Sequence, residues 1–319
     1  MTNNDNGYNS KRAWYELKPT LVDRAAPFDF NLVKLRNTGY IFLSTAIFAP
    51  FFINILISYM FAHNEYVLAG MNFISWIIVG SGSYFVISGA QNEIMRSGAI
   101  AFYYFYFIPN IIGLVIGTIA NQFDPAVSVK TTINLLASII AGLVTIFILY
   151  RSSPSIFKKI KLTLKQNYKR ILVVYTIGII AIFSIHLFFV YLQSLITTTI
   201  SNNQNNLIVW LDKWWNIVFL FIYTICIAPI VEELATRHGI FSLSGNKWLG
   251  FVSSIIFFAG MHVSGTGDWE HIIGYIGASL TLGMLFLIVN GNVTYTIISH
   301  AGYNLIVAIL MLVAPKFLS

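Results

Sequence analysis

The sequence predicts an all-α protein, a polytopic bundle of about eight or nine transmembrane helices. Of its 319 residues, 57% are hydrophobic and only 10% are charged, and the mean hydropathy is +0.73. Soluble domains carry about 25% charged residues, so this composition excludes a water-exposed surface. The apolar runs are continuous and reach about 20 residues, the length at which a helix crosses a bilayer. Barrel strands would instead alternate over about ten residues.

The apolar runs define the expected crossings in chain order. They are residues 39–61, 67–90, 98–120, 131–150, 171–193, 207–231, 248–264, 271–289 and 293–314. The last three contain polar residues and are joined by short links, which leaves the count at eight or nine. Aromatic residues make up 16% of the chain, as expected for lipid-facing helices with aromatic belts at the membrane interfaces.

Basic residues predict the orientation. The polar segment 1–38 is expected to be a cytoplasmic tail, and its basic residues are Lys11, Arg12, Lys18, Arg24, Lys34 and Arg36. Segment 151–170 has no acid and is expected to be a cytoplasmic loop, because cytoplasmic loops are enriched in Lys and Arg. Its basic residues are Arg151, Lys158, Lys159, Lys161, Lys165, Lys169 and Arg170. The formal net charge of +7 therefore indicates membrane lipids, not nucleic acid, as the partner.

Three parts follow from this pattern: the tail 1–38, the transmembrane helices 39–206, and a membrane domain 207–319 that carries the candidate chemistry. The Asn-, Ile- and Lys-rich composition favours a multi-pass protein of a bacterial plasma membrane with a cytoplasmic N-terminus. Cys226 is the one cysteine, so no disulfide framework is expected.

Ionisable residues inside membrane spans are costly and indicate function, and they concentrate in the last third of the chain. Glu233 and Arg237 are four residues apart, the spacing of a helical ion pair. Glu232 is rotated by about 100° from Glu233 and is therefore expected to remain available for chemistry. Pro229 should interrupt the same helix and leave backbone carbonyls unpaired.

Two further strings repeat the four-residue spacing. Phe258 and His262 share one helix face, and so do His300 and Asn304. A carboxylate beside an imidazole can deprotonate a water molecule, while His300 and Asn304 could donate hydrogen bonds to a developing oxyanion. The reaction class implied is hydrolysis of an acyl bond, with a peptide as the natural substrate. The site is expected below the cytoplasmic surface and open toward the cytosol.

Two alternative chemistries are weaker. Zinc could be held by Glu232, His262 and His300, because three protein ligands suffice. However, helical zinc proteases usually carry His-Glu-x-x-His, which is absent, so no cofactor is expected. The string Gly265-Thr-Gly-Asp268 is similar to that of presenilin-type aspartyl proteases. That chemistry needs a second intramembrane aspartate, and the nearest one, Asp212, lies beside Lys213 at a predicted interface.

The three strings together resemble the signature of the CPBP family, which comprises CAAX proteases and bacteriocin-processing (Abi) enzymes. The resemblance covers roughly residues 210–312 and implies an intramembrane endopeptidase. It implies that Glu232 and His262 activate water, that His300 and Asn304 form the oxyanion site, and that Glu233 and Arg237 support the helix. Family members are described as metalloproteases and as metal-independent glutamate proteases, and the spacing favours the second type.

The resemblance also implies a peptide or membrane-protein substrate, with roles in bacteriocin maturation, self-immunity or membrane-protein processing. Two other functions stay open. The protein could be a non-enzymatic immunity factor or scaffold, or a transporter that uses Glu232 and His262 as a proton relay.

Overall fold

The computed structural model describes Tyr15 and residues 37–61, 64–123, 126–166, 168–211 and 213–313. Most of the expected cytoplasmic tail and Asp212 therefore lie outside the described residues. Within these ranges the chain is helical and contains no strand, which confirms the predicted all-α fold class.

The described helices include short π-helical and 3₁₀ turns, labelled η. In chain order they are α2 (Thr38–Phe42), η1 (Leu43–Phe48), α3 (Ala49–Phe61), α4 (Glu65–Ser97), α5 (Ala101–Asn121), α6 (Val127–Ser152), α7 (Pro154–Gln166), α8 (Tyr168–Ser194), α9 (Asn202–Trp210), α10 (Trp214–Phe221), η2 (Ile222–Ile227), α11 (Ala228–Glu233), η3 (Leu234–Gly239), α12 (Ile240–Leu243), α13 (Lys247–Met261), η4 (Trp269–His271), α14 (Ile272–Ile288) and α15 (Val293–Val313).

Eight helical stretches in the described part of the chain are long and apolar enough to cross a membrane. They confirm the predicted crossings except in two places. The predicted crossing 207–231 begins later, at Trp214, because α9 ends at Trp210 and a break follows. The predicted crossing 248–264 is the shorter helix α13, which has 15 residues and ends at Met261.

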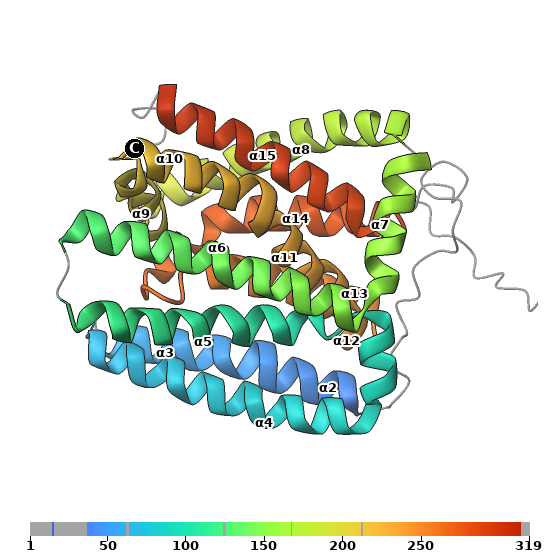
Figure 1. Ribbon diagram of the computed structural model, residues 1–319, viewed down its shortest axis with the longest axis horizontal. Coiled ribbons are helices and arrows are strands. Elements are labelled where there is room, and N and C mark those ends of the chain that lie inside the picture. Colours follow the sequence, from blue (N-terminus) through green and yellow to red (C-terminus); the bar gives the residue numbers. More distant parts are fainter. Residues whose placement is uncertain are drawn as a thin grey trace, which may run out of the picture.

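The early and late helices pack into one bundle with a shared core (Figure 1). The ring of Phe102 on α5 lies 5.0 Å from the ring of Phe42 on α2 and 5.0 Å from that of Phe257 on α13. Phe241 on α12 packs 4.8 Å from Phe286 on α14. Each of these aromatic side chains buries a large apolar area in the contact between helices. The N-terminal helices are therefore packed onto the last third of the chain.

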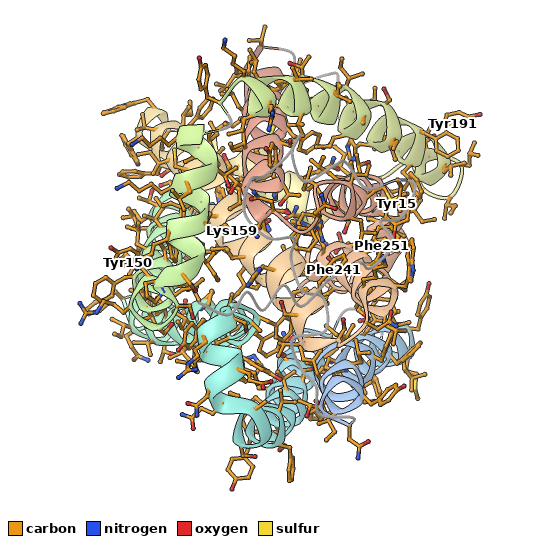
Figure 2. All side chains as sticks on the ribbon, turned by 90° about the vertical axis from the view of Figure 1, so that its right-hand side faces the viewer. Tyr15, Tyr150, Lys159, Tyr191, Phe241 and Phe251 are labelled. Carbon is orange, nitrogen blue, oxygen red and sulfur yellow. The ribbon has the colours of Figure 1, made fainter. Side chains whose placement is uncertain are left out.

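The basic segment expected to be a loop forms helix α7, which lies across one end of the bundle (Figures 1 and 2). Pro154 begins the helix, a position that suits its fixed φ and missing N–H. Ile156 and Thr163 are buried on one face, whereas Lys158, Lys161 and Lys165 are exposed. The Asn292 Nδ2 atom donates to Thr163 Oγ1 at 2.9 Å. This contact ties α7 to the turn before α15.

Candidate active site

The sixth crossing is interrupted where the sequence places Pro229. The N–H of Ala228 reaches back five residues to the carbonyl of Tyr223, so this turn is π-helical. The next carbonyl, that of Thr224, would need the N–H that Pro229 lacks. It accepts instead from Asn304 Nδ2 at 2.8 Å. The proline therefore creates the acceptor that docks α15, and π-helical turns of this kind are frequent at functional sites.

Arg237 is fully buried and is held from several helices. Its Nε lies 3.3 Å from Glu233 Oε2, which confirms the pair predicted from the spacing. The guanidinium donates to the hydroxyl of Ser254 on α13, and its Nη2 lies 3.4 Å from Ser279 Oγ on α14. The guanidinium carbon also lies 4.9 Å from the centre of the Phe258 ring. A buried charge needs such partners, so Arg237 joins three helices around the site.

The other oxygen of Glu233 fixes the imidazole of His300. His300 Nδ1 lies 3.0 Å from Glu233 Oε1. An ionised carboxylate only accepts hydrogen bonds, so the proton in this contact belongs to Nδ1. His300 Nε2 then faces Glu232, whose Oε2 is 3.8 Å away. Such a gap is one that a water molecule can bridge.

Four ionisable groups thus form one continuous cluster: Arg237, Glu233, His300 and Glu232. With both glutamates ionised and His300 protonated, the cluster has zero net charge. Moving one proton from His300 to Glu232 leaves the total at zero. Proton transfer therefore does not add a net charge to a buried site, where an unpaired charge would be costly.

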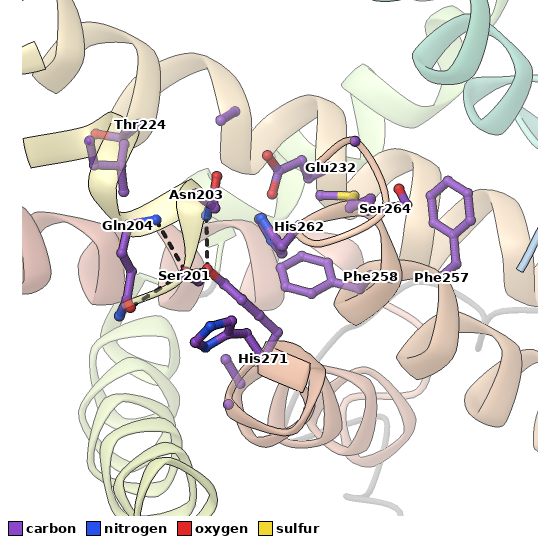
Figure 3. Close-up of a pocket in the computed structure, with 18 of the residues that line it drawn as sticks. Ser201, Asn203, Gln204, Thr224, Glu232, Phe257, Phe258, His262, Ser264 and His271 are labelled. Atoms are coloured by element: carbon purple, nitrogen blue, oxygen red, sulfur yellow. Dashed lines mark hydrogen bonds between the residues drawn. The ribbon is translucent and has the colours of Figure 1, made fainter. Parts of the chain in front are cut away.

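His262 follows the end of α13, at the start of a turn. Its ring and the ring of His300 both neighbour the ring of Phe258. The Phe258 ring lies 5.1 Å from the His262 ring and 5.7 Å from the His300 ring. In Figure 3 the side chains of Glu232 and His262 point into the same space. The structure therefore brings together the three strings that the sequence singled out.

Tyr275 on α14 is a neighbour of the site that the sequence reasoning missed. Its ring stacks on that of His262, with centroids 4.8 Å apart and an interplanar angle of 17°. Its hydroxyl lies 2.7 Å from Ser201 Oγ and accepts from Asn203 Nδ2 at 3.2 Å. No local spacing marks Tyr275, because all three partners come from other elements. It connects the His262 ring to the start of α9.

Asp268, part of the aspartyl-protease-like string, has a structural role in the described chain. Its carboxylate accepts from the backbone N–H of Asn202 at 2.8 Å and from the hydroxyl of Thr266. His271 is buried next to it and contacts Gln193 Nε2 at 3.0 Å and Thr199 Oγ1 at 3.2 Å. These bonds hold the α8–α9 connection against the turn after α13.

A cavity of about 1680 Å³ contains the candidate residues in its wall. Glu232, His262, His300 and Asn304 line it, together with residues of α3, α4, α5 and α6. Glu233 and Arg237 lie behind the wall. The volume exceeds the 300–1,000 Å³ typical of small-molecule pockets. The cavity is thus large enough for a polypeptide segment.

The cavity lies at the end of the bundle opposite α7, so the expected opening toward the cytosol and the expected cytoplasmic placement of segment 151–170 do not both hold. The sequence analysis placed the opening on the cytoplasmic side, the side assigned to segment 151–170. The residues that line the cavity lie instead in the half of the bundle away from α7: those on α8 run from Phe183 to Ser194, and those on α15 begin at His300. The depth of His262 in the bundle could not be predicted from the sequence. The sequence indicated a full crossing, but α13 has 15 residues and ends at Met261, directly before His262.

The described residues contain no group of three or more His, Cys, Asp or Glu side chains arranged to hold a metal ion. In the proposed zinc set, His300 uses Nδ1 for Glu233 and the His262 ring is stacked on Tyr275. In His300 only Nε2 would then be a ligand atom, whereas ring stacking occupies neither nitrogen of His262. The metal-independent site stays a prediction.

An apolar helical bundle with a buried Glu/His cluster beside a large cavity defines a polytopic membrane protein with an ionisable site inside the bundle. Residues 214–306 match the family model described as type II CAAX prenyl endopeptidase Rce1-like. The chain is 31% identical over 139 residues to the UPF0177 protein YbdI of Lactococcus lactis subsp. lactis, covering 44% of this chain and 71% of that protein. The chain belongs to the CPBP/CAAX protease family.

A longer match extends over the N-terminal helices. The chain is 27% identical over 322 residues to a protein of Mycoplasma capricolum subsp. capricolum that carries the name "Uncharacterized protein", with 93% of each chain covered. No solved structure matches the chain significantly. These relatives are bacterial, and the family indicates a CAAX-type protease that acts in the membrane.

Proposed function

We propose that the protein hydrolyses a peptide bond of a membrane-associated polypeptide by direct attack of an activated water molecule. The observation that carries this proposal is the 3.8 Å separation of Glu232 Oε2 and His300 Nε2 in the wall of a cavity that His262 also lines. A general base must lie within hydrogen-bonding reach of the proton that it removes, directly or through one water molecule.

In the proposed reaction, a water molecule lies in the cavity within reach of Glu232, His262 and His300, which all line it. Glu232 accepts one proton as the water oxygen bonds to the peptide carbonyl carbon, which gives a tetrahedral intermediate. That proton then passes to the amide nitrogen as the C–N bond breaks, and the products are a carboxylic acid and an amine. When Glu232 takes up that proton, the cluster with Arg237, Glu233 and protonated His300 gains one positive charge, and the oxyanion of the intermediate balances it.

His300 and Asn304 are proposed to stabilise the oxyanion. When protonated, His300 can donate from Nε2 while Nδ1 remains bonded to Glu233. Asn304 has two amide hydrogens, and one of them is used for the Thr224 carbonyl. The second is available to a substrate oxygen. Donors that are fixed before the reaction stabilise developing charge without reorganisation.

The biological role proposed is processing of a peptide or membrane protein in a bacterial plasma membrane, including bacteriocin maturation or self-immunity. The name of the matching family model adds prenylated polypeptides as a substrate class. A proton-coupled transporter is less well supported, because Glu232 is the only Asp, Glu, Lys or Arg among the described residues that line the cavity.

The test compares membrane-protein and secreted-peptide profiles of cells that express the wild type, Glu232→Gln, His262→Ala or Glu93→Gln. Glu93 is exposed on α4 and serves as the matched control. We expect cleavage products that are present with the wild type and Glu93→Gln and absent with the two site variants, at equal amounts of inserted protein. Full activity of Glu232→Gln would overturn the hydrolase proposal.

A further inference from the structure

Helix α9 brings two amide side chains to the part of the cavity near His262. Asn203 and Gln204 line the cavity and are half-buried. Tyr275 connects them to the candidate site, because its ring stacks on that of His262 with centroids 4.8 Å apart and its hydroxyl contacts Asn203. Figure 3 shows the side chains of Asn203, His262 and Glu232 around the same part of the cavity. Amide groups of α9 therefore lie beside the candidate active site.

The directions of the hydrogen bonds determine how both amides are oriented. The Ser201 hydroxyl donates to Gln204 Oε1 at 3.4 Å, and a hydroxyl has only one hydrogen to donate. In its 2.7 Å contact with Tyr275, Ser201 is therefore the acceptor and the Tyr275 hydroxyl is the donor. The Tyr275 oxygen accepts in turn from Asn203 Nδ2 at 3.2 Å. One chain of hydrogen bonds thus orients the amide of Asn203 and the amide of Gln204.

Each amide keeps its other polar atom for a ligand. Among the described residues, Asn203 Oδ1 and Gln204 Nε2 have no hydrogen-bond partner, and neither is one of the buried side-chain atoms that lack a partner. Both atoms are therefore accessible from the cavity that their residues line. Asn203 Oδ1 only accepts hydrogen bonds, whereas Gln204 Nε2 only donates them. Together they offer one acceptor and one donor without any charge.

A polypeptide backbone presents the complementary groups. Every residue other than proline carries one N–H donor and one C=O acceptor. These groups need hydrogen-bond partners when they enter a cavity whose wall is largely apolar, because an unpaired polar group is costly there. A helical segment pairs its own N–H and C=O groups. The two amides of α9 therefore suit a non-helical segment, and they suit it whatever its side chains are.

We propose that Asn203 and Gln204 form a backbone-binding subsite for a non-helical polypeptide segment. In this subsite, Asn203 Oδ1 accepts from one backbone N–H of the ligand, and Gln204 Nε2 donates to one backbone C=O. That the bound segment is also hydrolysed rests on the proposed function, whereas the subsite itself rests on the geometry of α9 and Tyr275. Both amides lie outside residues 214–306, which the family model matches.

Binding of ester-substituted peptides to the full-length protein in detergent tests the subsite. The probe is a fluorescent peptide with a palmitoyl anchor and an Ala/Ser segment. In a matched series, an ester replaces one backbone amide at a time, which removes one N–H and keeps every side chain. Dissociation constants are measured by fluorescence anisotropy in a Glu232→Gln background, so that the peptide is not cleaved. Asn203→Leu removes the acceptor, and Asn205→Leu, at an exposed residue of α9 that does not line the cavity, is the matched control.

We expect one ester position to weaken binding about fivefold in the Glu232→Gln background and in the Asn205→Leu control, which is the range of one lost hydrogen bond. The same ester should have less than a twofold effect with Asn203→Leu. Gln204→Met should weaken binding of the all-amide peptide about fivefold and leave the sensitivity to that ester. Absence of a sensitive position, equal sensitivity with Asn203→Leu, or no binding of the all-amide peptide would overturn the subsite.

A conservative variant separates ligand binding from a structural role of Asn203. Asn203→Asp keeps an acceptor oxygen and should retain the sensitivity to the ester, and its loss in this variant would also overturn the subsite. Cleavage distinguishes this inference from the proposed function. If the protein with Glu232 intact does not cleave the all-amide peptide although the ester pattern holds, the proposed hydrolysis fails and the subsite stands. If the peptide is cleaved and Asn203→Leu leaves the pattern unchanged, the hydrolysis stands and the subsite fails.

Discussion

His300 Nδ1 lies 3.0 Å from Glu233 Oε1, and this contact determines which nitrogen of the imidazole faces the cavity. Glu233 is oriented in turn by Arg237, whose Nε is 3.3 Å from the second carboxylate oxygen. The pair predicted from a helical spacing of four is thus the first link of a longer chain. Glu232, next in sequence to Glu233, meets the other nitrogen of the same ring.

Removing Arg237 should destabilise the protein. Arg237→Ala leaves the carboxylate of Glu233 buried without its cation, and breaking a buried pair in this way costs about 3–5 kcal/mol. We expect a lower yield of folded protein in detergent and a lower midpoint of thermal unfolding. Arg96→Ala removes an exposed arginine of α4 and should leave both unchanged. Equal behaviour of the two variants would show that the ion pair contributes little.

Two variants of Tyr275 should show whether this residue positions His262 or only stabilises the fold. Tyr275→Phe keeps the ring on His262 but loses the contacts with Ser201 and Asn203. We expect KM for a model substrate to change by about threefold or more, because a lost hydrogen bond is worth about 0.5–1.5 kcal/mol, with kcat retained. Tyr275→Leu should also lower kcat, since His262 loses its stacking partner. Tyr191→Phe, at an exposed tyrosine of α8, is the control, and a similar effect of all three variants would refute the role.

The close approach of α15 and α8 should be sensitive to a single methyl group. A Cβ at Gly302 would collide with the ring of Tyr175, and overpacking of this kind costs about 1–3 kcal/mol. Gly302→Ala is expected to lower thermal stability, and adding Tyr175→Ala should recover part of the loss. Gly117→Ala on α5, where a Cβ meets no atom within 4 Å, should not destabilise. A stable Gly302→Ala variant would contradict the packing described here.

Metal dependence is tested with the purified protein. We expect EDTA and 1,10-phenanthroline to leave cleavage unchanged, because the proposed water activation uses Glu232 and His262. Zinc content after purification, measured by elemental analysis, should be well below one equivalent. Inhibition that added zinc reverses would favour the alternative in which Glu232, His262 and His300 are ligands.

Much of the fold follows from the sequence, because the length of an apolar run reports a crossing directly. The Glu233–Arg237 pair was also predictable, since both residues lie on one helix. The contact between Glu233 and His300 was not, because it joins residues 67 positions apart. Tyr275 and the placement of the cavity at the end of the bundle opposite α7 were missed for the same reason. Both depend on how separate helices align in depth, and helical spacing carries no information about that alignment.

The family model matches residues 214–306, yet α3, α4, α5 and α6 supply a large part of the cavity wall. The Glu/His cluster thus lies in the matched segment, whereas part of the cavity wall is encoded in the first half of the gene. A homologue with different N-terminal helices could keep the same Glu/His cluster and accept a different substrate. Selectivity and reactivity can therefore evolve separately on this scaffold.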